Sequence, residues 1–323
     1  MRAILNRRYG AAEDLRLAEI DPPALEPDHA VVRVRAASVN AGDWRLMRGW
    51  PRIARPMMGG LRGPSPPVRG WDLAGVVESV ADGVEGLAPG DEVFGTGGGT
   101  FAELATARAD TLAPKPAWLS YEQAAAIGVA GVTALQSLRD RARVEPGQRV
   151  LVTGAGGGVG TFAVQIAKAY GAEVTAVCSA AKADLVKELG ADRVIDYRLA
   201  DFTRDRGRYD VILDIGSGRS LRATRRALAG DGMMIVMGGK GNVVGPIARI
   251  AGVVILKQFA RGQKLMPFLA RPTRADLLEL AGLIEAGKLR VAVDRTFQLA
   301  EAPAAIRYVE DGHVRGKAVV LVS

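Results

Sequence analysis

The sequence predicts an α/β protein of two domains, in which a β-rich domain comes first and a doubly wound parallel sheet follows. Residues 1–120 contain short alternating strands separated by Gly and Pro turns. Beyond them, short apolar strands alternate with helices, the pattern of a parallel sheet. The length of 323 residues also favours two cores over one. We therefore expect one domain from residues 1–120 and 265–323, and a second from residues 121–264.

In the first domain, residues 31–36 alternate apolar and polar side chains, as a half-buried strand does. Residues 75–80 and 100–105 predict two further strands between Gly-rich turns. Residues 51–67 are rich in Pro, Gly and Arg without periodicity, so we expect a long surface loop there.

The second domain is expected to begin with a helix, because Ser120 and Gln123 have the spacing of a capping box. Short apolar segments then predict the parallel strands, at residues 150–153, 174–178, 193–196, 211–214 and 233–237. In the tail, residues 274–286 predict a helix that ends at Gly287, and residues 317–322 predict a final strand. We expect this tail to return to the first domain.

A glycine-dense turn joins the strand at residues 150–153 to a helix at residues 161–170, and a second strand follows. Glycine lets the backbone approach a ligand closely, and the N–H groups at a helix start favour a pyrophosphate. The spacing departs from the plain G-x-G-x-x-G pattern, but the order of strand, turn, helix and strand is the required context. We predict a dinucleotide site, against the alternative of a similar scaffold with an empty site. The predicted cofactor-binding residues of the turn are Gly154, Gly156, Gly157, Gly158, Val159 and Gly160.

The end of the second strand indicates which dinucleotide binds. An NAD site usually carries an acidic residue about twenty residues after the glycines, bonded to the ribose 2′-hydroxyl. Here that place holds Cys178 and Ser179, followed by Lys182. A hydroxyl and an ammonium suit a 2′-phosphate, which a carboxylate would repel. We predict NADPH, with Ser179, Lys182 and the Tyr197 hydroxyl at the phosphate; Lys182 could also be an ordinary solvated lysine.

The ends of the later strands complete the predicted cofactor site. Gly216 follows one of them, and Met237, Gly238 and Gly239 follow another. Strand ends of an open α/β sheet face the crevice in which ligands bind, so this backbone could hold the nicotinamide carboxamide.

Composition excludes several other functions. The net charge of +8 is spread along the chain without a run of five basic residues, so we expect no nucleic-acid partner. The single cysteine, Cys178, excludes an internal disulfide and a cysteine-rich metal site. His29 and His313 lack partners at ligand spacing.

The N-terminus has no signal-peptide pattern, and the apolar stretch 247–256 is too short to span a bilayer, so we expect a cytoplasmic protein without a membrane span.

Three stretches in the first domain, together with the glycine turn, resemble the medium-chain dehydrogenase/reductase superfamily. They are residues 37–44, 70–77 and 89–95, and the resemblance covers nearly the whole chain. It is closest to the zinc-independent quinone oxidoreductase branch, which implies a GroES-like catalytic domain and a Rossmann domain. Zinc-dependent relatives place a Cys where this chain has Val39-Asn40, and a His-Glu pair where it has Trp71-Asp72. We therefore expect no metal.

The resemblance also implies residue roles and an activity. It places Asn40 near the nicotinamide ribose and the substrate, although Asn40 could instead stabilise a turn. It places Thr133 near the nicotinamide, and Asp43 is expected to hold the loop together. It implies an NADPH-dependent oxidoreductase that reduces quinones or α,β-unsaturated carbonyls, and a homodimer in which the apolar run 244–256 pairs across a two-fold axis.

The chain departs from this family at the proton donor. Related enoyl and quinone reductases often carry a tyrosine shortly after the Asn-x-x-Asp element, and residues 44–51 contain none. This counts against an enoyl-thioester reductase, which needs a positioned acid, but that activity and a non-catalytic NADPH-binding redox sensor stay open. Trp44, Trp50 and Trp71 could form an apolar wall for a ring or be ordinary core residues, and Arg45 and Arg48 could meet an anion or solvent.

Overall fold

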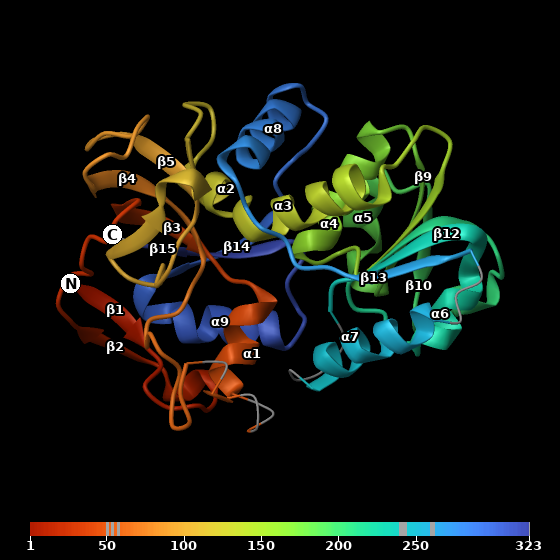
Figure 1. The fold of residues 1–323 in the computed structure, drawn as a ribbon, viewed down its shortest axis with the longest axis horizontal. Coiled ribbons are helices and arrows are strands. Elements are labelled where there is room, and N and C mark those ends of the chain that lie inside the picture. The colour runs from red at the N-terminus through yellow and green to blue at the C-terminus, as the bar shows by residue number, and fades with distance from the viewer. Residues whose placement is uncertain (50–51, 53–54, 57–58, 239–243, 259–261, 323) are drawn as a thin grey trace. The chain divides into compact units, whose positions relative to one another are not determined.

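The computed structural model describes the chain except residues 50–51, 53–54, 57–58, 239–243, 259–261 and 323, and gives only the backbone of residues 244–250. Two compact units form (Figure 1). The first comprises Met1–Val132, Pro272–Gly282 and Val291–Ser323, and the second comprises Thr133–Arg271 and Leu283–Arg290. The first boundary thus lies after Val132 and not after residue 120, because helix α2 (Tyr121–Ala125) packs on strands of the first unit.

The first unit is built on a mainly antiparallel sheet in the order β14-β15-β3-β4-β5-β7, with β6 also paired to β3 and with a separate β1-β2 pair. Its strands are β1 (Arg2–Leu5), β2 (Arg16–Glu19), β3 (His29–Ser38), β4 (Asp72–Val80), β5 (Glu92–Thr96), β6 (Leu104–Arg108), β7 (Leu112–Pro114), β14 (Val293–Gln298) and β15 (Lys317–Leu321). Helices α1 (Ala41–Arg48) and α9 (Ala302–Glu310) also belong to it. The core includes Leu73, Phe101 and Ile306, all fully buried.

The strand expected at residues 100–105 is wrong in its position. Regular pairing begins at Leu104, where β6 starts. Before it, Phe101 accepts a hydrogen bond from Ile4, and Ala102 forms an isolated bridge with Ala3. The segment therefore crosses the edge of β1 before it joins the main sheet.

The second unit confirms the predicted doubly wound sheet. Its parallel strands lie in the order β10-β9-β8-β11-β12-β13. Their bounds are β8 (Arg149–Thr153), β9 (Glu173–Cys178), β10 (Arg193–Asp196), β11 (Tyr209–Asp214), β12 (Leu228–Val236) and β13 (Lys264–Pro267). The chain runs outward from β8 to β10 and then returns to β11, so the topological switch point lies between β8 and β11.

Helices cover both faces of this sheet. Helices α4 (Gly158–Ala169) and α5 (Ala183–Glu188) lie on one face, and α6 (Leu221–Ala227) and α7 (Val244–Lys257) on the other (Figure 1). Two further helices, α3 (Gly128–Gln136) and α8 (Arg274–Glu285), contain residues of both units.

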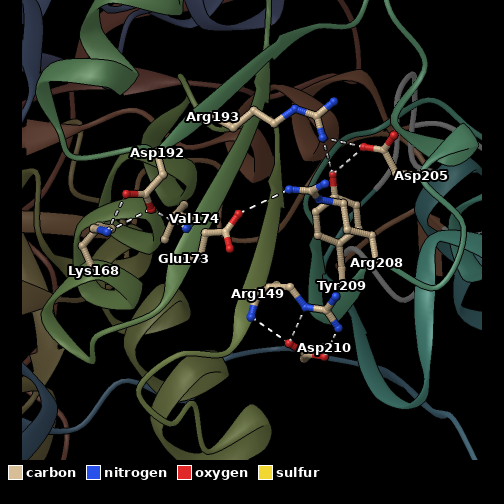
Figure 2. Close-up of polar contacts among 10 residues, drawn as sticks. All are labelled: Arg149, Lys168, Glu173, Val174, Asp192, Arg193, Asp205, Arg208, Tyr209 and Asp210. Atoms are coloured by element: carbon tan, nitrogen blue, oxygen red, sulfur yellow. Dashed lines mark hydrogen bonds and ion pairs between the residues drawn. The ribbon is translucent and has the colours of Figure 1, made fainter.

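Polar contacts bind the amino ends of the parallel strands together (Figure 2). The Arg149 guanidinium donates to Asp210 with an Nη2–Oδ1 distance of 2.7 Å, which joins β8 to β11. Asp192 joins Lys168 of α4 to the backbone N–H of Val174 in β9. This edge is therefore occupied by structural ion pairs, and the opposite, carboxyl edge carries the glycine turn.

Candidate active site

The glycine turn packs the start of α4 directly onto the end of β8. Gly154 follows the strand with φ +67°, and its carbonyl accepts the N–H of Gly157 at 3.0 Å. A Cβ on Gly160 would lie 2.3 Å from the Gly154 oxygen and 2.6 Å from the Ala155 Cα. No side chain fits there, so Gly160 permits the close contact of helix and turn that a dinucleotide fold requires. The helix begins at Gly158, with Gly157 as its N-cap, and its first N–H groups are available to an anion.

Lys182 lies beside this turn. A Cβ on Gly156 would come within 2.7 Å of both Cβ and Cδ of the Lys182 side chain. The position follows from the short turn after β9, in which the Lys182 N–H donates to the Ser179 carbonyl at 2.9 Å. The Lys182 side chain therefore lies against the glycine turn, and a cation there suits the phosphate groups of a dinucleotide.

Tyr197 lies at the neighbouring strand end. Its backbone N–H donates to the Cys178 carbonyl at 3.2 Å, and its ring packs on the core of the unit. The guanidinium of Arg198 lies 5.8 Å from the Tyr197 ring centroid. The sequence reasoning missed Arg198, an exposed second cation at this edge beside the partly buried Lys182. A basic residue shortly after a strand is the signal for it.

The lone thiol at this edge is a packing group. Cys178 is buried at the end of β9, and burial, reinforced by Asp196, raises its pKa to about 11. The thiol therefore stays neutral near pH 7, so it is not a nucleophile of the site.

Two buried polar residues that the sequence reasoning did not single out hold the switch-point loops. The Thr153 hydroxyl accepts the N–H groups of Ile215 at 3.0 Å and Gly216 at 3.3 Å, and it donates to Asp214 at 3.1 Å. A threonine and an aspartate that each end a buried apolar strand are the signal that could have revealed them. Gly216 thereby lies beside Gly154, where a Cβ would be 3.7 Å from the Gly216 nitrogen.

The end of β12 comes to the same edge. Met237 donates its N–H to the Asp214 carbonyl at 3.1 Å, and its sulfur lies 4.0 Å from the Ser137 hydroxyl oxygen. That hydroxyl also donates to the Thr133 carbonyl at 2.6 Å, so Thr133 and Met237 both contact Ser137. Gly238 is buried, and Gly239 lies outside the described residues.

In the first unit, Asn40 and Asp43 form the start of α1. Asp43 accepts the backbone N–H of Asn40 at 2.7 Å, so its carboxyl group holds the turn. Burial raises the pKa of Asp43 to about 7. This carboxyl group is therefore much less acidic than an exposed aspartate.

A buried polar cluster surrounds the Asn40 side chain, and we call it the Asn40 cluster: Ser38, Asn40, Asp72 and Lys317. Asp72 Oδ2 accepts from Ser38 at 2.7 Å, from Asn40 Nδ2 at 2.9 Å and from Lys317 Nζ at 3.1 Å. Lys317 also donates to Asn40 Oδ1 at 2.7 Å. The side chains of Lys317 and Asp72 are only 3% and 0% exposed. Sequence reasoning missed Lys317, although a lysine on the apolar strand β15 is an unusual choice.

The aromatic and basic side chains of α1 are engaged locally. The Arg45 guanidinium lies 5.0 Å from the Trp44 ring centroid, and Arg48 forms an ion pair with Glu310 at 2.8 Å. Trp71 lies against Gly42, and Trp50 lies outside the described residues.

The described residues contain no group of three or more His, Cys, Asp or Glu side chains that could hold a metal ion. No helix among them has both the length and the apolar character needed to cross a membrane.

Known proteins agree with this architecture. Residues 26–117 match the alcohol dehydrogenase GroES-like domain family, and residues 189–320 match the family described as zinc-binding dehydrogenase. The mitochondrial NAD(P)H oxidoreductase RTN4IP1 of Mus musculus is 33% identical, with 98% of this chain and 87% of the relative covered.

Solved structures show the same likeness. The quinone oxidoreductase of Coxiella burnetii aligns with a TM-score of 0.88 at 30% identity, covering 100% of this chain and 99% of the other. The Escherichia coli quinone oxidoreductase complexed with NADPH aligns with a TM-score of 0.84 at 28% identity, covering 99% of this chain and 100% of the other.

Fold and site together define an NAD(P)H-binding oxidoreductase with a GroES-like domain and a Rossmann domain, as the sequence predicted. The chain belongs to the medium-chain dehydrogenase/reductase family, in its zinc-independent, quinone oxidoreductase-like branch.

Proposed function

We propose that this protein reduces quinones or α,β-unsaturated carbonyl compounds with NADPH as the preferred cofactor. The observation that carries the cofactor preference is the contact between Lys182 and Gly156, which brings a cation to the phosphate-binding turn. No acidic residue takes the usual NAD-selecting place at Cys178–Ser179. The similar E. coli quinone oxidoreductase was solved in complex with NADPH, which supports the same preference.

In this proposal, residues of the chain bind the cofactor and orient the acceptor. The backbone N–H groups that open α4 bind the pyrophosphate, and Ser179, Lys182 and Tyr197 bind the 2′-phosphate. The backbone at Gly216 and Met237 holds the nicotinamide carboxamide, and Asn40 meets the acceptor. When bound, NADPH supplies a hydride, and the acceptor takes its proton from water because the family's tyrosine is missing. Quinones and enones tolerate this route, since their reduced oxygens are stable enough to wait for a solvent proton.

A turnover panel tests the proposal. Oxidation of NADPH and of NADH would be followed at the nicotinamide absorbance with a benzoquinone, a naphthoquinone, an alkyl enone and crotonyl-CoA. We expect turnover of quinones or enones and a preference for NADPH. Turnover of crotonyl-CoA alone would support the enoyl-thioester alternative. Tight NADPH binding with no turnover would support the redox-sensor alternative.

We also propose a homodimer, by resemblance to the family, and a cytoplasmic location. Helix α7 presents Val254 and Ile255, which are 58% and 60% exposed, and a second copy would cover them across a two-fold axis. Sedimentation at micromolar concentration tests the assembly, and a monomer would overturn it.

A further inference from the structure

Three neighbouring strands build the Asn40 cluster. In the first unit's sheet, β3 lies between β15 and β4, and Ser38 of β3 is paired in register with Asp72 of β4 and with Val319 of β15. Lys317 therefore approaches Asn40 from one neighbouring strand and Asp72 approaches from the other. Gly128 makes room for the carboxylate, because a Cβ there would lie 2.5 Å from Asp72 Oδ1.

The cluster allows only one orientation of the Asn40 carboxamide. Its oxygen accepts from the Lys317 ammonium, and one N–H donates to the Asp72 carboxylate. A flipped amide would set its NH₂ group against the ammonium and its oxygen against the carboxylate, and both contacts would be repulsive. The amide is therefore fixed by charge on both of its ends.

One donor of this amide is not used within the part of the chain that the structure describes. The second N–H of Asn40 has no partner among the described residues, and Asn40 is only partly buried. The ammonium on the amide oxygen polarises the whole group, which strengthens that N–H as a donor. The same ammonium brings positive charge near any oxygen that this N–H would bind.

We propose that Lys317 and Asp72 are positioning residues that orient the free N–H of Asn40 toward the carbonyl oxygen of the acceptor. This inference rests on the proposed function. It identifies the donor that binds the substrate oxygen while hydride transfer gives that oxygen negative charge. Such a donor acts most strongly on the developing charge. An acceptor without a carbonyl oxygen gains nothing from this donor, which is consistent with the carbonyl-bearing substrates of the proposed function.

A double-mutant cycle tests this role. Asn40→Ala and Lys317→Met should each lower kcat/KM for a quinone by about 10- to 100-fold, because a displaced contact at the reacting group costs about that much. In the Asn40→Ala background, Lys317→Met should have little further effect, because residues that act as one unit are not additive. The Kd for NADPH should stay within about threefold, since the cluster lies in the first unit. Effects that multiply, or full activity in Lys317→Met, would overturn the proposal.

An exchange of charges separates positioning from folding. Asp72→Asn alone leaves the ammonium unneutralised and sets its NH₂ group either against the Asn40 NH₂ group or against the backbone N–H of Val129, which donates to Asp72 Oδ1 at 2.7 Å. Adding Asn40→Asp restores one carboxylate and one amide at the same distance, so folding should recover. The free N–H is not restored, so quinone turnover should stay low. Recovery of both folding and turnover would show that the cluster is structural only.

A measurement that does not need turnover keeps the two claims apart. Duroquinone with NADP⁺ cannot react by hydride transfer, so it is a stable probe of the acceptor site. In wild-type protein, adding this pair should change the NMR chemical shift of one side-chain amide proton of Asn40. That change should be absent in Lys317→Met. A shift without turnover of any acceptor would leave this inference standing and reject the proposed function. Turnover without a chemical-shift change at Asn40 would support the proposed function and reject this inference.

Discussion

The side chain of Lys182 crosses the glycine turn at Gly156, where a Cβ would lie 2.7 Å from the lysine Cβ. The two residues are on different loops, one after β8 and the other after β9, and the parallel sheet brings them together. This contact joins the backbone proposed to bind the pyrophosphate to Lys182, the cation proposed to bind the 2′-phosphate. Its consequences can be measured one residue at a time.

Reversing the charge of Lys182 should change cofactor preference. Lys182→Glu should weaken NADPH binding about 10- to 100-fold and leave NADH binding nearly unchanged. The substitution removes the hydrogen bond from the ammonium to the 2′-phosphate and sets a carboxylate against that phosphate, which NADH lacks. Lys187→Glu, on an exposed position of α5, is the matched control and should affect both cofactors little. Calorimetric titration measures both affinities, and equal losses for the two cofactors would show that Lys182 does not read the 2′-phosphate.

Adding one methyl group at Gly160 should disrupt the cofactor turn. Gly160→Ala sets a Cβ 2.3 Å from a backbone oxygen, so it should cost about 1–3 kcal/mol of unfolding free energy and abolish tight NADPH binding. Gly282→Ala is the control, because its Cβ meets nothing within 4 Å on α8. That variant should gain about 0.5–1 kcal/mol and bind NADPH normally. Chemical denaturation and calorimetry check both, and normal binding by Gly160→Ala would contradict the tight packing.

Asp43 should make stability depend on pH. Burial raises its pKa to about 7 from an ordinary value of 3.8, so the folded state favours the protonated form. This contribution is fully present below pH 3.8 and is lost as pH rises through about 7. The unfolding free energy of wild type should therefore fall relative to Asp43→Asn between these limits. Denaturation across the pH series measures the difference, and a constant difference would show that Asp43 ionises normally.

The ion pairs at the amino edge should matter for stability and not for the cofactor. Asp210→Ala removes three hydrogen bonds from Arg149, at 2.7, 2.8 and 3.1 Å, and should cost about 0.5–1.5 kcal/mol. The Kd for NADPH should stay unchanged, since Arg149 begins β8 and the glycine turn follows the other end of that strand. A large loss of affinity in a folded Asp210→Ala protein would contradict this division of the sheet.

Local patterns in the sequence carried most of the fold. Apolar runs marked the parallel strands from β8 to β12, and Ser120 with Gln123 marked α2, whose capping bonds the structure contains. The strand β13 was not predicted, because Lys264–Pro267 is short and ends in proline. The position of α2 within the first unit was not predicted either, since packing between distant segments decides it.

Some residues of the candidate site could likewise be predicted from the sequence, and others could not. The glycine turn and Lys182 could be found because each lies shortly after the end of a predicted strand, β8 for the turn and β9 for Lys182. The cluster of Asn40, Asp72 and Lys317 spans 277 positions from Asn40 to Lys317, and only strand pairing brings them together. A lysine at the start of the apolar strand β15 is unusual, but the sequence does not show which side chains it meets, so its role became visible only through its partners.

Hydride reduction of a carbonyl acceptor by NADPH is the reaction that this chain is expected to perform. Its decisive test is an anaerobic single turnover, in which excess protein with bound NADPH is mixed with a limiting benzoquinone. We expect the loss of one NADPH for each quinone reduced, with a slower rate when the transferred hydrogen of the nicotinamide is replaced by deuterium. An unchanged nicotinamide absorbance, with NADPH still bound, would contradict this reaction.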